Sequence, residues 1–475
     1  MSVLKRISIR YLPFADAASD DLPLGQLLRL SLFQVSVGMA TVMLLGTLNR
    51  VMIVELKVAA FLVAAMVALP VLIAPFRALL GFKSDTYKSA IGWKRIPYLW
   101  FGTLWQFGGL AIMPAALLVL GGDVTQVRYD IPFAGEALAA LAFLMTGLGM
   151  HMTQTAGLAL AADRATDETR PRVVALLYVM LLVGMAVSSL VIGYLLKEFT
   201  ALELIGVVQG AALMTLVLNV IALWKQERVR PMNRAEREAP TPSFRDAWAD
   251  YAAGGTAGRL LVVVFLGTMA FNMQDVLLEP YGGEILGLSV SATTLLTASW
   301  AAGALVGFAF AAKWLAEGMN PYRMGARGIL AGLAAFSAVI FANPMGSSEM
   351  FFIGACLIGF GGGLFAVATL TAAMTMPAGV AGRGLALGAW GAAQATAAGL
   401  STAIGGGLRD LVNAAATQGH LGVALNDPST GYSVVYHLEI FLLFVTLVAL
   451  GPLVRTATTN RNGGTGKFGL ADLPT

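Results

Sequence analysis

A group of polar residues at the end of one apolar stretch has the spacing and the setting to handle protons or ions. Asn272, Asp275 and Glu279 are three and four residues apart, so a helix places them on one face, with Gln274 beside them. The preceding residues are uncharged, and at about 1.5 Å per residue Asp275 falls near the far edge of a bilayer. Pro280 and the glycines after it are expected to break the helix. Carboxylates in such a place typically mark an ion or proton pathway; the alternative is a solvated helix end.

A histidine lies near the middle of another apolar stretch. His151 has 14 uncharged residues before it and 11 after it, which places it close to the centre of a bilayer. A neutral imidazole there can ligate a metal, including the magnesium of a chlorin, or relay protons. It can also simply hydrogen-bond a Gln or Thr of a neighbouring helix, and both interpretations remain open. Three further residues are candidates to line a site for a flat apolar ligand: Gln154, and Trp390 and Gln394 on a Gly- and Ala-rich helix.

The segment between the second and third apolar stretches carries a charged pattern. Gly81 and Asp85 are followed by Gly92, Lys94 and Arg95. A short acid and a basic pair can bridge helix ends, and glycine permits a tight turn between them. The pattern therefore predicts either a latch that joins helices on one side of the membrane or a charged loop that only fixes topology.

Four more polar residues lie in a short connection after the first apolar stretch. Asn49 and Arg50 precede Glu55 and Lys57, on the side of the membrane where the acidic group of the seventh stretch is expected. Arg50 or Lys57 can therefore pair with Asp275 or Glu279. The sequence predicts an outer-side polar network made of these residues.

The sequence has no pattern typical of an enzyme. It contains no phosphate-binding loop, no HExxH and no serine nucleophile elbow, and it has only three His and one Cys. The lone Cys356 excludes a disulfide framework and a Cys-based metal centre. We therefore expect no catalysis, no nucleotide and no metal-ion site of the protein's own.

Composition places the chain in a lipid bilayer. Of its 475 residues 57% are hydrophobic and 12% are charged, whereas soluble proteins carry about 25% charged residues. The net charge of +4 reflects topology rather than affinity for nucleic acid. The apolar stretches predict an all-α membrane protein with twelve transmembrane helices, at 30–49, 58–76, 96–120, 137–160, 173–196, 204–224, 260–279, 289–312, 326–346, 350–376, 384–408 and 433–454.

The basic residues are distributed unequally between the two sides. Of 31 Lys and Arg residues, five fall in the loops of one side: Arg50, Lys57, Arg128, Lys197 and Arg409. The positive-inside rule then predicts that both termini are cytoplasmic.

The longest charged interruption divides the chain in two. The Pro-containing segment 225–259 is predicted to be a cytoplasmic linker between six-helix halves at 30–224 and 260–454. The segments 1–29 and 455–475 are predicted to be cytoplasmic. Twelve spans divided six plus six are typical of the major facilitator superfamily.

Several long strings are more specific than this architecture. They are 10–16, 30–38, 46–55, 74–85, 273–283 and the stretch from Trp390 to Gln394. In these strings the chain resembles the PucC-type, or bacteriochlorophyll delivery, family of the major facilitator superfamily. The resemblance implies an assembly factor for light-harvesting complexes in the intracytoplasmic membrane of a photosynthetic bacterium. It further implies bacteriochlorophyll a as cargo and the antenna α and β polypeptides as partners, with contacts to the machinery of pigment synthesis and membrane insertion. Members serve the core antenna (LhaA-like) or the peripheral antenna (PucC).

Three functions fit these residues. The leading hypothesis is a pigment-binding assembly factor, with His151 as axial ligand and Gln154, Trp390 and Gln394 lining the site. The second is a proton-coupled secondary transporter of a small solute, in which Asp275 and Glu279 titrate. The third is a pigment-free scaffold that packs against antenna helices.

Overall fold

The computed structural model describes most of the chain, and in the described residues it contains helices and turns but no strand. The described residues are 17–19, 22–48, 51–52, 56, 58, 60–120, 133–196, 200–238, 240–253, 255–288, 290–376, 382–422 and 425–462. The prediction of an all-α membrane protein is therefore confirmed for this part of the chain.

The helices fall into two sets joined by a linker. The first set is α2 (Leu24–Thr41) with η2 (Val42–Leu48), α3 (Ala60–Ile73) with η4 (Ala74–Phe76) and α4 (Arg77–Asp85), α5 (Ile96–Leu120), α6 (Ala134–Arg164), α7 (Arg170–Leu195) and α8 (Ala201–Leu223). The linker contains α9 (Arg234–Glu238) and α10 (Phe244–Ala253). The second set is α11 (Thr256–Asn272) with η5 (Met273–Val276) and α12 (Leu278–Glu284), α13 (Val290–Ala316), α14 (Pro321–Ala342), α15 (Ser348–Thr375), α16 (Gly382–Thr417) and α17 (Ser429–Asn462).

These segments agree with the predicted spans. Among the described residues, eleven helices are long and apolar enough to cross a membrane. The remaining predicted span, 384–408, lies within α16, whose glycines and polar residues lower its hydropathy. At 36 residues α16 is nevertheless about 54 Å long, enough to cross a bilayer.

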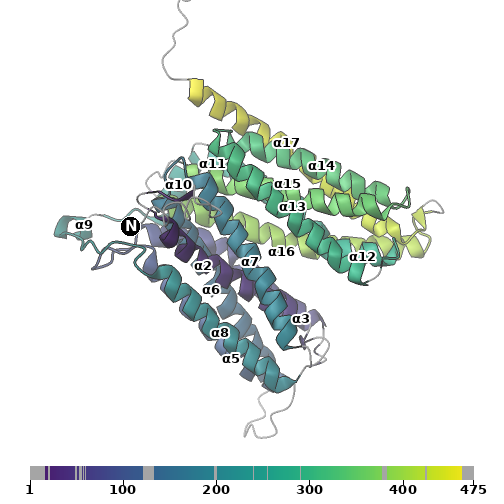
Figure 1. Ribbon diagram of the computed structural model, residues 1–475, viewed down its shortest axis with the longest axis horizontal. Helices are drawn as coiled ribbons and strands as arrows, with labels where there is room; N and C mark the ends of the chain where they lie inside the picture. Colours follow the sequence, from purple (N-terminus) through teal and green to yellow (C-terminus); the bar gives the residue numbers. More distant parts are fainter. Residues whose placement is uncertain are drawn as a thin grey trace, which may run out of the picture.

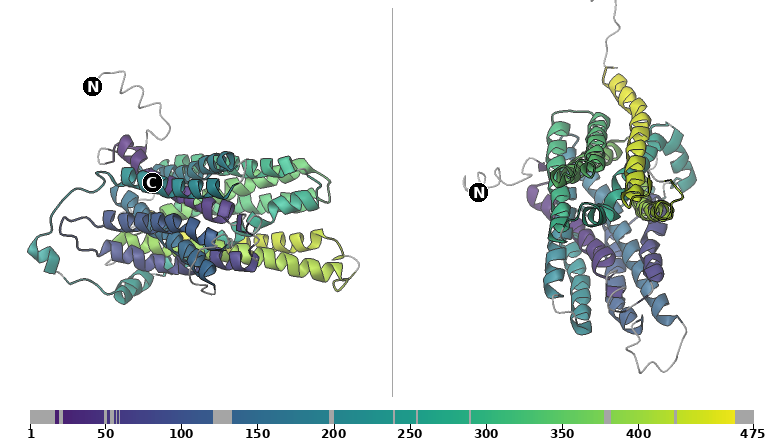
Figure 2. Two further views of the ribbon diagram at one scale, coloured as in Figure 1. Left: turned by 90° about the horizontal axis from the view of Figure 1, so that it is seen from below. Right: turned by 90° about the vertical axis from the view of Figure 1, so that its right-hand side faces the viewer.

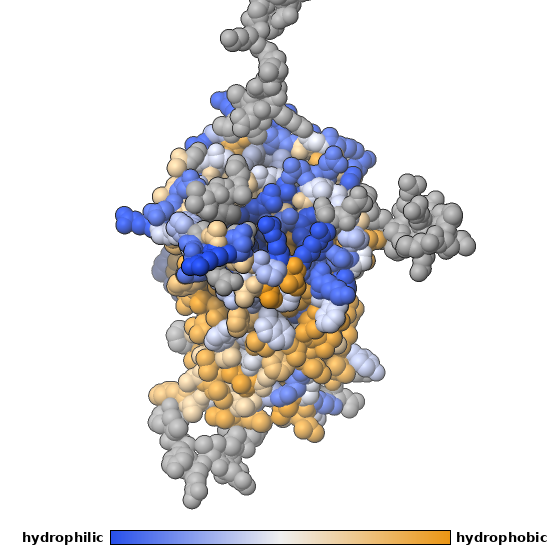
Figure 3. Space-filling view, turned by 90° about the vertical axis from the view of Figure 1, so that its left-hand side faces the viewer, coloured by the Kyte–Doolittle hydropathy of each residue, from blue (hydrophilic) through white to orange (hydrophobic). Residues whose placement is uncertain are grey.

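The two sets lie together at one end of the molecule and diverge toward the other (Figure 1). Their helices run along the long axis, and the teal linker helices α9 and α10 lie at one end (Figure 2). We call this end, with the connections 86–95 and 165–169, the linker end, and the opposite end the far end. Hydrophilic side chains gather across the linker end, with hydrophobic side chains on the flank below (Figure 3).

The seventh span departs from its prediction. Its α-helical geometry is interrupted at Met273–Val276, and Pro280 lies in the first turn of α12, where a missing backbone N–H costs little. The prediction that Pro280 and the glycines break the helix is therefore wrong, because the chain stays helical to Glu284. Asp275 therefore lies about 13 Å along the helical segment before Glu284, where this span ends.

The linker is more than a spacer. Helix α10 packs its Phe244 against Phe82 of α4, with ring centroids 5.5 Å apart. Ala247 of α10 belongs to the same buried cluster as Leu385 and Ala389 of α16. One amphipathic helix thus contacts both halves at the linker end.

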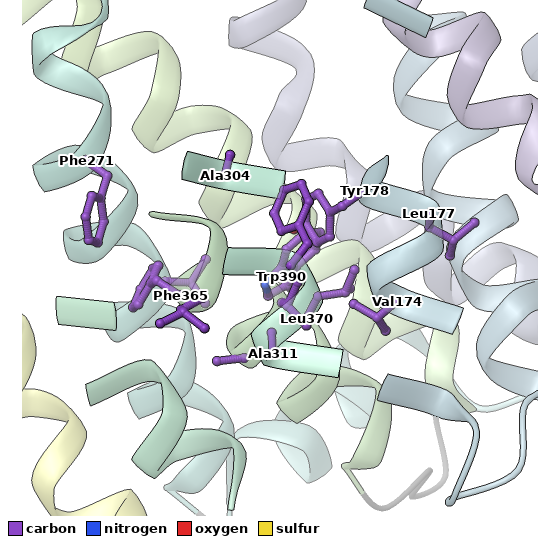
Figure 4. Packing of buried hydrophobic residues seen from close by; sticks show 14 of the residues in the cluster. Val174, Leu177, Tyr178, Phe271, Ala304, Ala311, Phe365, Leu370 and Trp390 are labelled. Atoms are coloured by element: carbon purple, nitrogen blue, oxygen red, sulfur yellow. The ribbon is translucent and has the colours of Figure 1, made fainter. Parts of the chain in front are cut away.

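The two halves share a hydrophobic core. Tyr178 of α7 stacks on Phe308 of α13, with ring centroids 5.3 Å apart. Trp390 of α16 lies in the same cluster, near Tyr178 and Leu370, and is 2% exposed (Figure 4). Residues of both halves therefore form one hydrophobic cluster where α7, α13, α15 and α16 meet.

Candidate functional site at the contact between the two halves

A carboxylate joins the two halves at the linker end. Asp85, the last residue of α4, accepts hydrogen bonds from the backbone N–H groups of Gly384 (3.0 Å) and Leu385 (2.9 Å). These groups belong to the first turn of α16, where unsatisfied N–H groups and the helix dipole favour an anion. The aspartate therefore caps a helix of the other half.

Arg95, the residue directly before α5, connects Asp85 to α6. Its guanidinium pairs with Asp85 and donates to Asp163 of α6 (3.0 Å) and to Ser84 (2.6 Å). Arg383 of α16 lies 3.7 Å from the same Asp163. Burial lowers the pKa of Arg95, but the carboxylates of Asp163 and Asp85 outweigh it and hold the pKa above its ordinary value. We call Asp85, Arg95, Asp163 and Arg383 the linker-end bridge; each charge in it has an opposite partner.

Glycines let the helices of the bridge touch. A Cβ on Gly81 would lie 1.8 Å from the carbonyl oxygen of Gly384, and one on Gly388 would lie 2.2 Å from that of Arg77. Gly81 lies inside α4, where it permits close backbone contact with α16. Gly92 does occupy a turn, with φ of +83°, where it packs against the backbone of Arg230.

The basic pair of the loop starts a helix. The Glu227 carboxylate of the linker accepts hydrogen bonds from the backbone N–H groups of Lys94, Arg95 and Ile96, at 3.0 to 3.3 Å. It caps α5 and ties the linker to the bridge. The side chain of Arg95, and not that of Lys94, makes the ion pairs of the bridge.

A buried arginine lies about 12 Å further into the membrane. Arg77 is 1% exposed, and its Nε donates to Thr155 of α6 (3.0 Å) while one terminal nitrogen donates to the Gly391 carbonyl of α16 (3.2 Å). Its other terminal nitrogen has no partner, and no carboxylate pairs with it among the described residues. Sequence reasoning missed Arg77, although a lone Arg in the apolar run 58–82 was a visible signal.

The predicted pigment-site residues lie around this arginine, with one exception. His151 is half-buried and close enough to Arg77 to feel its charge. The Gln394 side chain lies near the hydroxyl of Tyr178, which also senses Arg77. The indole N–H of Trp390 is buried and has no hydrogen-bond partner in the part of the chain that the structure describes. Gln154 points elsewhere, with its Nε2 3.5 Å from Gln34 of α2.

The hydrogen bond of His151 fixes its tautomer. Its Nε2 lies 2.8 Å from the carbonyl oxygen of Pro70, which only accepts, so Nε2 carries the hydrogen. In the neutral ring Nδ1 is then the unprotonated nitrogen, free to ligate. An interhelical hydrogen bond was among the predicted roles, although with Gln or Thr as partner.

The predicted outer-side network is assembled only in part. Asp275 accepts from the amide groups of Asn272 (3.0 Å) and Gln274, whereas Glu279 accepts from the Thr297 hydroxyl of α13 and stands apart. Asn49, Arg50, Glu55 and Lys57 lie outside the described residues. The far-end cation that the structure describes is Arg409, which pairs with Glu284 and Tyr432 rather than with either predicted acid.

A second acid approaches Asp275 from another helix. Glu439 of α17 is 0% exposed, and the Asp275 carboxyl and the Gln274 backbone N–H lie close to it. Sequence reasoning included Glu439 in a span without noting it, although a single acid between Leu438 and Ile440 was the signal.

Comparison with known proteins identifies the family. A family described as "PUCC protein" matches residues 47–458. The chain belongs to the PucC family. An uncharacterized protein in the puhA-bchM intergenic region of Rhodobacter capsulatus is 62% identical over 472 residues, 99% of this chain and 98% of that relative. Protein PucC of Cereibacter sphaeroides is 51% identical over 461 residues, 96% and 98% of the two chains.

Solved structures with the same fold include a transporter of the major facilitator superfamily. FucP in its outward conformation has a TM-score of 0.62 at 13% identity, covering 93% of this chain and 99% of that one. A bacterial homologue of the iron transporter ferroportin, in an outward-facing state, has a TM-score of 0.68 at 15% identity, covering 90% and 98%. At such identities the likeness establishes the fold alone, and the predicted fold is confirmed.

Proposed function

We propose that this protein is an assembly factor for photosynthetic light-harvesting complexes, which binds bacteriochlorophyll and passes it to the antenna α and β polypeptides. The match to the PucC family over residues 47–458 carries the proposal. A more distant relative, 28% identical over 405 residues, is named the bacteriochlorophyll synthase 44.5 kDa chain of Rhodobacter capsulatus. Handing over an intact pigment makes and breaks no covalent bond, so the proposal includes no catalytic step.

The groups around Arg77 suit a chlorin. Such a pigment is flat and apolar, takes a nitrogen ligand on its magnesium and carries carbonyl groups at its edge. His151 Nδ1 supplies the lone pair, while the free terminal N–H of Arg77 and the indole N–H of Trp390 supply donors without partners. Buried donors without acceptors are costly, so a ligand that satisfies them gains affinity.

The direction of access follows from the bridge and from the basic residues. We propose that the linker end faces the cytoplasm, because the basic loops and the linker lie there. The bridge then closes the cytoplasmic side in this conformation, and opening it gives the site access from that side. The proposed location is the inner, intracytoplasmic membrane.

The competing function is transport of a small solute. The fold of the chain is that of transporters, and an alternating opening of its two ends would serve either activity. A transporter needs no bound pigment, and neither does a pure scaffold for antenna helices. Pigment binding therefore separates the proposal from both alternatives.

The test is to purify the protein from a photosynthetic host and record its near-infrared absorption. We expect bound bacteriochlorophyll, with antenna polypeptides co-purifying. His151→Gln keeps an N–H that can reach the Pro70 carbonyl but lacks the imidazole, so the pigment is expected to be lost. His437→Gln, at an exposed histidine of α17, is the matched control and should retain it. Antenna polypeptides without pigment would support the scaffold, and absence of both would contradict the proposal.

A further inference from the structure

A glutamate lies inside the second half with nothing to hold its charge. Glu439 is ten residues from Ser429, the first residue of α17, and so about 15 Å along the helix from the far end. Its side chain is 0% exposed, and neither carboxylate oxygen has a hydrogen-bond partner of normal geometry among the described residues. An ionised carboxylate at such a site suffers a large desolvation cost unless a cation or several donors surround it.

The described groups around Glu439 bring no cation to it. Next to it lie the Asp275 carboxyl and the backbone N–H of Gln274. Tyr436, one turn earlier on α17, is 0% exposed, and no described residue forms a hydrogen bond with its hydroxyl. The other charged and titratable groups with described side chains on α17 and on the helices packed against it are Arg259, Glu279, Tyr281, Glu284, Tyr322, Arg323, Arg327, Arg383, Arg409, Asp410, Tyr432, His437 and Arg455.

These other groups are held elsewhere. Arg409 is occupied by Glu284, Asp410 and Tyr432 at the far end. His437 is exposed and its ring contacts the carbonyl of Ser433. The remaining arginines belong to the ends of α11, α14, α16 and α17 nearest the linker, far along each helix from Glu439. Two carboxyls without a cation cannot both be ionised cheaply, so the pair favours holding a proton.

Asp275 differs from Glu439 in access. Its side chain is exposed, whereas that of Glu439 is 0% exposed. It accepts hydrogen bonds only from the neutral amides of Asn272 and Gln274. Asp275 therefore has contact with the outside of the molecule, whereas Glu439 is buried next to it.

We propose that Asp275 and Glu439 form a proton-binding site, in which Asp275 exchanges protons with the surroundings and Glu439 stores one inside the second half. A proton from water adds to the Asp275 carboxylate, and that carboxyl then passes it to the Glu439 carboxylate. Asp275 regains its negative charge, Glu439 becomes neutral, and nothing is oxidised or reduced. The proposal is independent of pigment binding, because none of its residues belongs to the layer around Arg77.

The site has a mechanical connection to the linker-end bridge. The backbones of η5 and α16 are in close contact, because a Cβ on Gly405 of α16 would lie 2.8 Å from the carbonyl oxygen of Met273 in η5. The other end of the same α16 provides the N–H groups that Asp85 caps. Charging the acid pair shifts η5 against α16, so proton occupancy changes how readily the bridge opens.

The first experiment measures the proton directly, in the full-length protein reconstituted in lipid. Infrared difference spectra against pH report the carbonyl stretch of a protonated carboxyl. We expect this band in the native protein, its loss in Glu439→Gln, and its retention at a shifted frequency in Glu439→Asp, which keeps the acid. Glu349→Gln, at an exposed far-end carboxyl of α15, is the matched control and should leave the band unchanged. A native protein without the band, or a band that survives in Glu439→Gln, overturns the site.

The second experiment measures the coupling. Spin labels on cysteines at Lys88 and Glu317, in a Cys356→Ser background, report the distance between the halves at the linker end. We expect a pH-dependent shift between short and long distances in the native protein, absent in Glu439→Gln and moved to a different pH in Asp275→Asn. A pH response in Glu439→Gln equal to that of the native protein overturns the coupling. Pigment absorption is recorded in parallel, so failure of the proton site and failure of pigment binding are told apart.

Discussion

At the linker end, Asp85 accepts two backbone N–H groups and pairs with Arg95, whose guanidinium also reaches Asp163. In the second half, Glu439 is 0% exposed and its oxygens contact no donor of normal geometry among the described residues. The two residues carry the same acidic group, but only the charge of Asp85 is balanced by a cation and by hydrogen-bond donors. A buried charge with an opposite partner, here called compensated, holds helices together. A buried charge without such a partner, here called uncompensated, costs stability and is kept for another reason.

Arg77 extends the comparison to a cation. It lies in the same helix pair as the bridge, α4 and α16, but has hydrogen bonds only to neutral groups. The interface between the halves therefore contains a compensated layer at the linker end and an uncompensated layer deeper in the membrane. We infer that the first layer controls opening and that the second contacts the ligand.

The largest expected effect comes from removing one charge of the bridge. Asp85→Asn leaves the Arg95 guanidinium with one acid fewer and weakens the cap on α16, so we expect a loss of about 3 kcal/mol. Reversible unfolding in detergent measures the loss, and spin labels across the linker end should show an open population. Glu238→Gln removes an acid that is 64% exposed and pairs with Arg234, itself 90% exposed, and should cost less than about 1 kcal/mol. Equal effects of the two variants would contradict a structural role for the bridge.

A single methyl group tests the close contact of α4 and α16. Gly81→Ala places a Cβ 1.8 Å from the Gly384 carbonyl oxygen, so the two helices must separate, at a cost of about 2 kcal/mol. Gly407→Ala makes the same exchange on α16 where no atom lies within 4 Å. The control should be neutral or slightly stabilising, because alanine favours a helix. Unfolding measurements and linker-end distances check both, and a harmless Gly81→Ala would show that the helices do not need this contact.

Much of the fold could be predicted from hydropathy alone. The third span was predicted at 96–120 and α5 has those bounds, because each end is marked by a clear change from apolar to polar residues. The seventh span was the exception, since Pro280 suggested a break where it occupies a harmless first-turn position. Helix breakers act through their position within a turn, and that position is not visible until the helix start is known.

The site was less predictable than the fold. Asp85 and Arg95 could be singled out from their spacing, but Gly384 and Leu385, whose N–H groups donate to Asp85, are about 300 residues away in sequence. Arg77 and Glu439 were missed because each is one charge in an otherwise ordinary apolar span. Their meaning depends on what surrounds them, which a single sequence does not contain. The role of His151 in pigment binding stays a prediction.

A smaller effect with the opposite sign is expected at Arg77. Arg77→Met removes a buried charge without an acid partner and keeps much of the volume, so stability should stay equal or rise by about 1 kcal/mol. Bound pigment and antenna assembly should nevertheless be lost. Arg95→Met makes the same exchange in the compensated layer and should cost about 3 kcal/mol or more. Unfolding and near-infrared absorption measure the two properties, and loss of stability without loss of pigment in Arg77→Met would reverse our assignment of the layers.

The smallest effect sharpens the comparison within one helix. Tyr436 and Tyr432 are four residues apart on α17 and both 0% exposed, but the Tyr436 hydroxyl has no partner, whereas that of Tyr432 contacts Glu284 (2.7 Å) and Arg409 (2.6 Å). Tyr436→Phe removes an unsatisfied polar atom and should change the free energy of unfolding by less than about 0.5 kcal/mol. Tyr432→Phe removes a hydrogen bond to charged groups and should cost about 1.5 kcal/mol. If Tyr436→Phe is the more costly variant, its hydroxyl has a partner in solution, and the region around Glu439 is compensated after all.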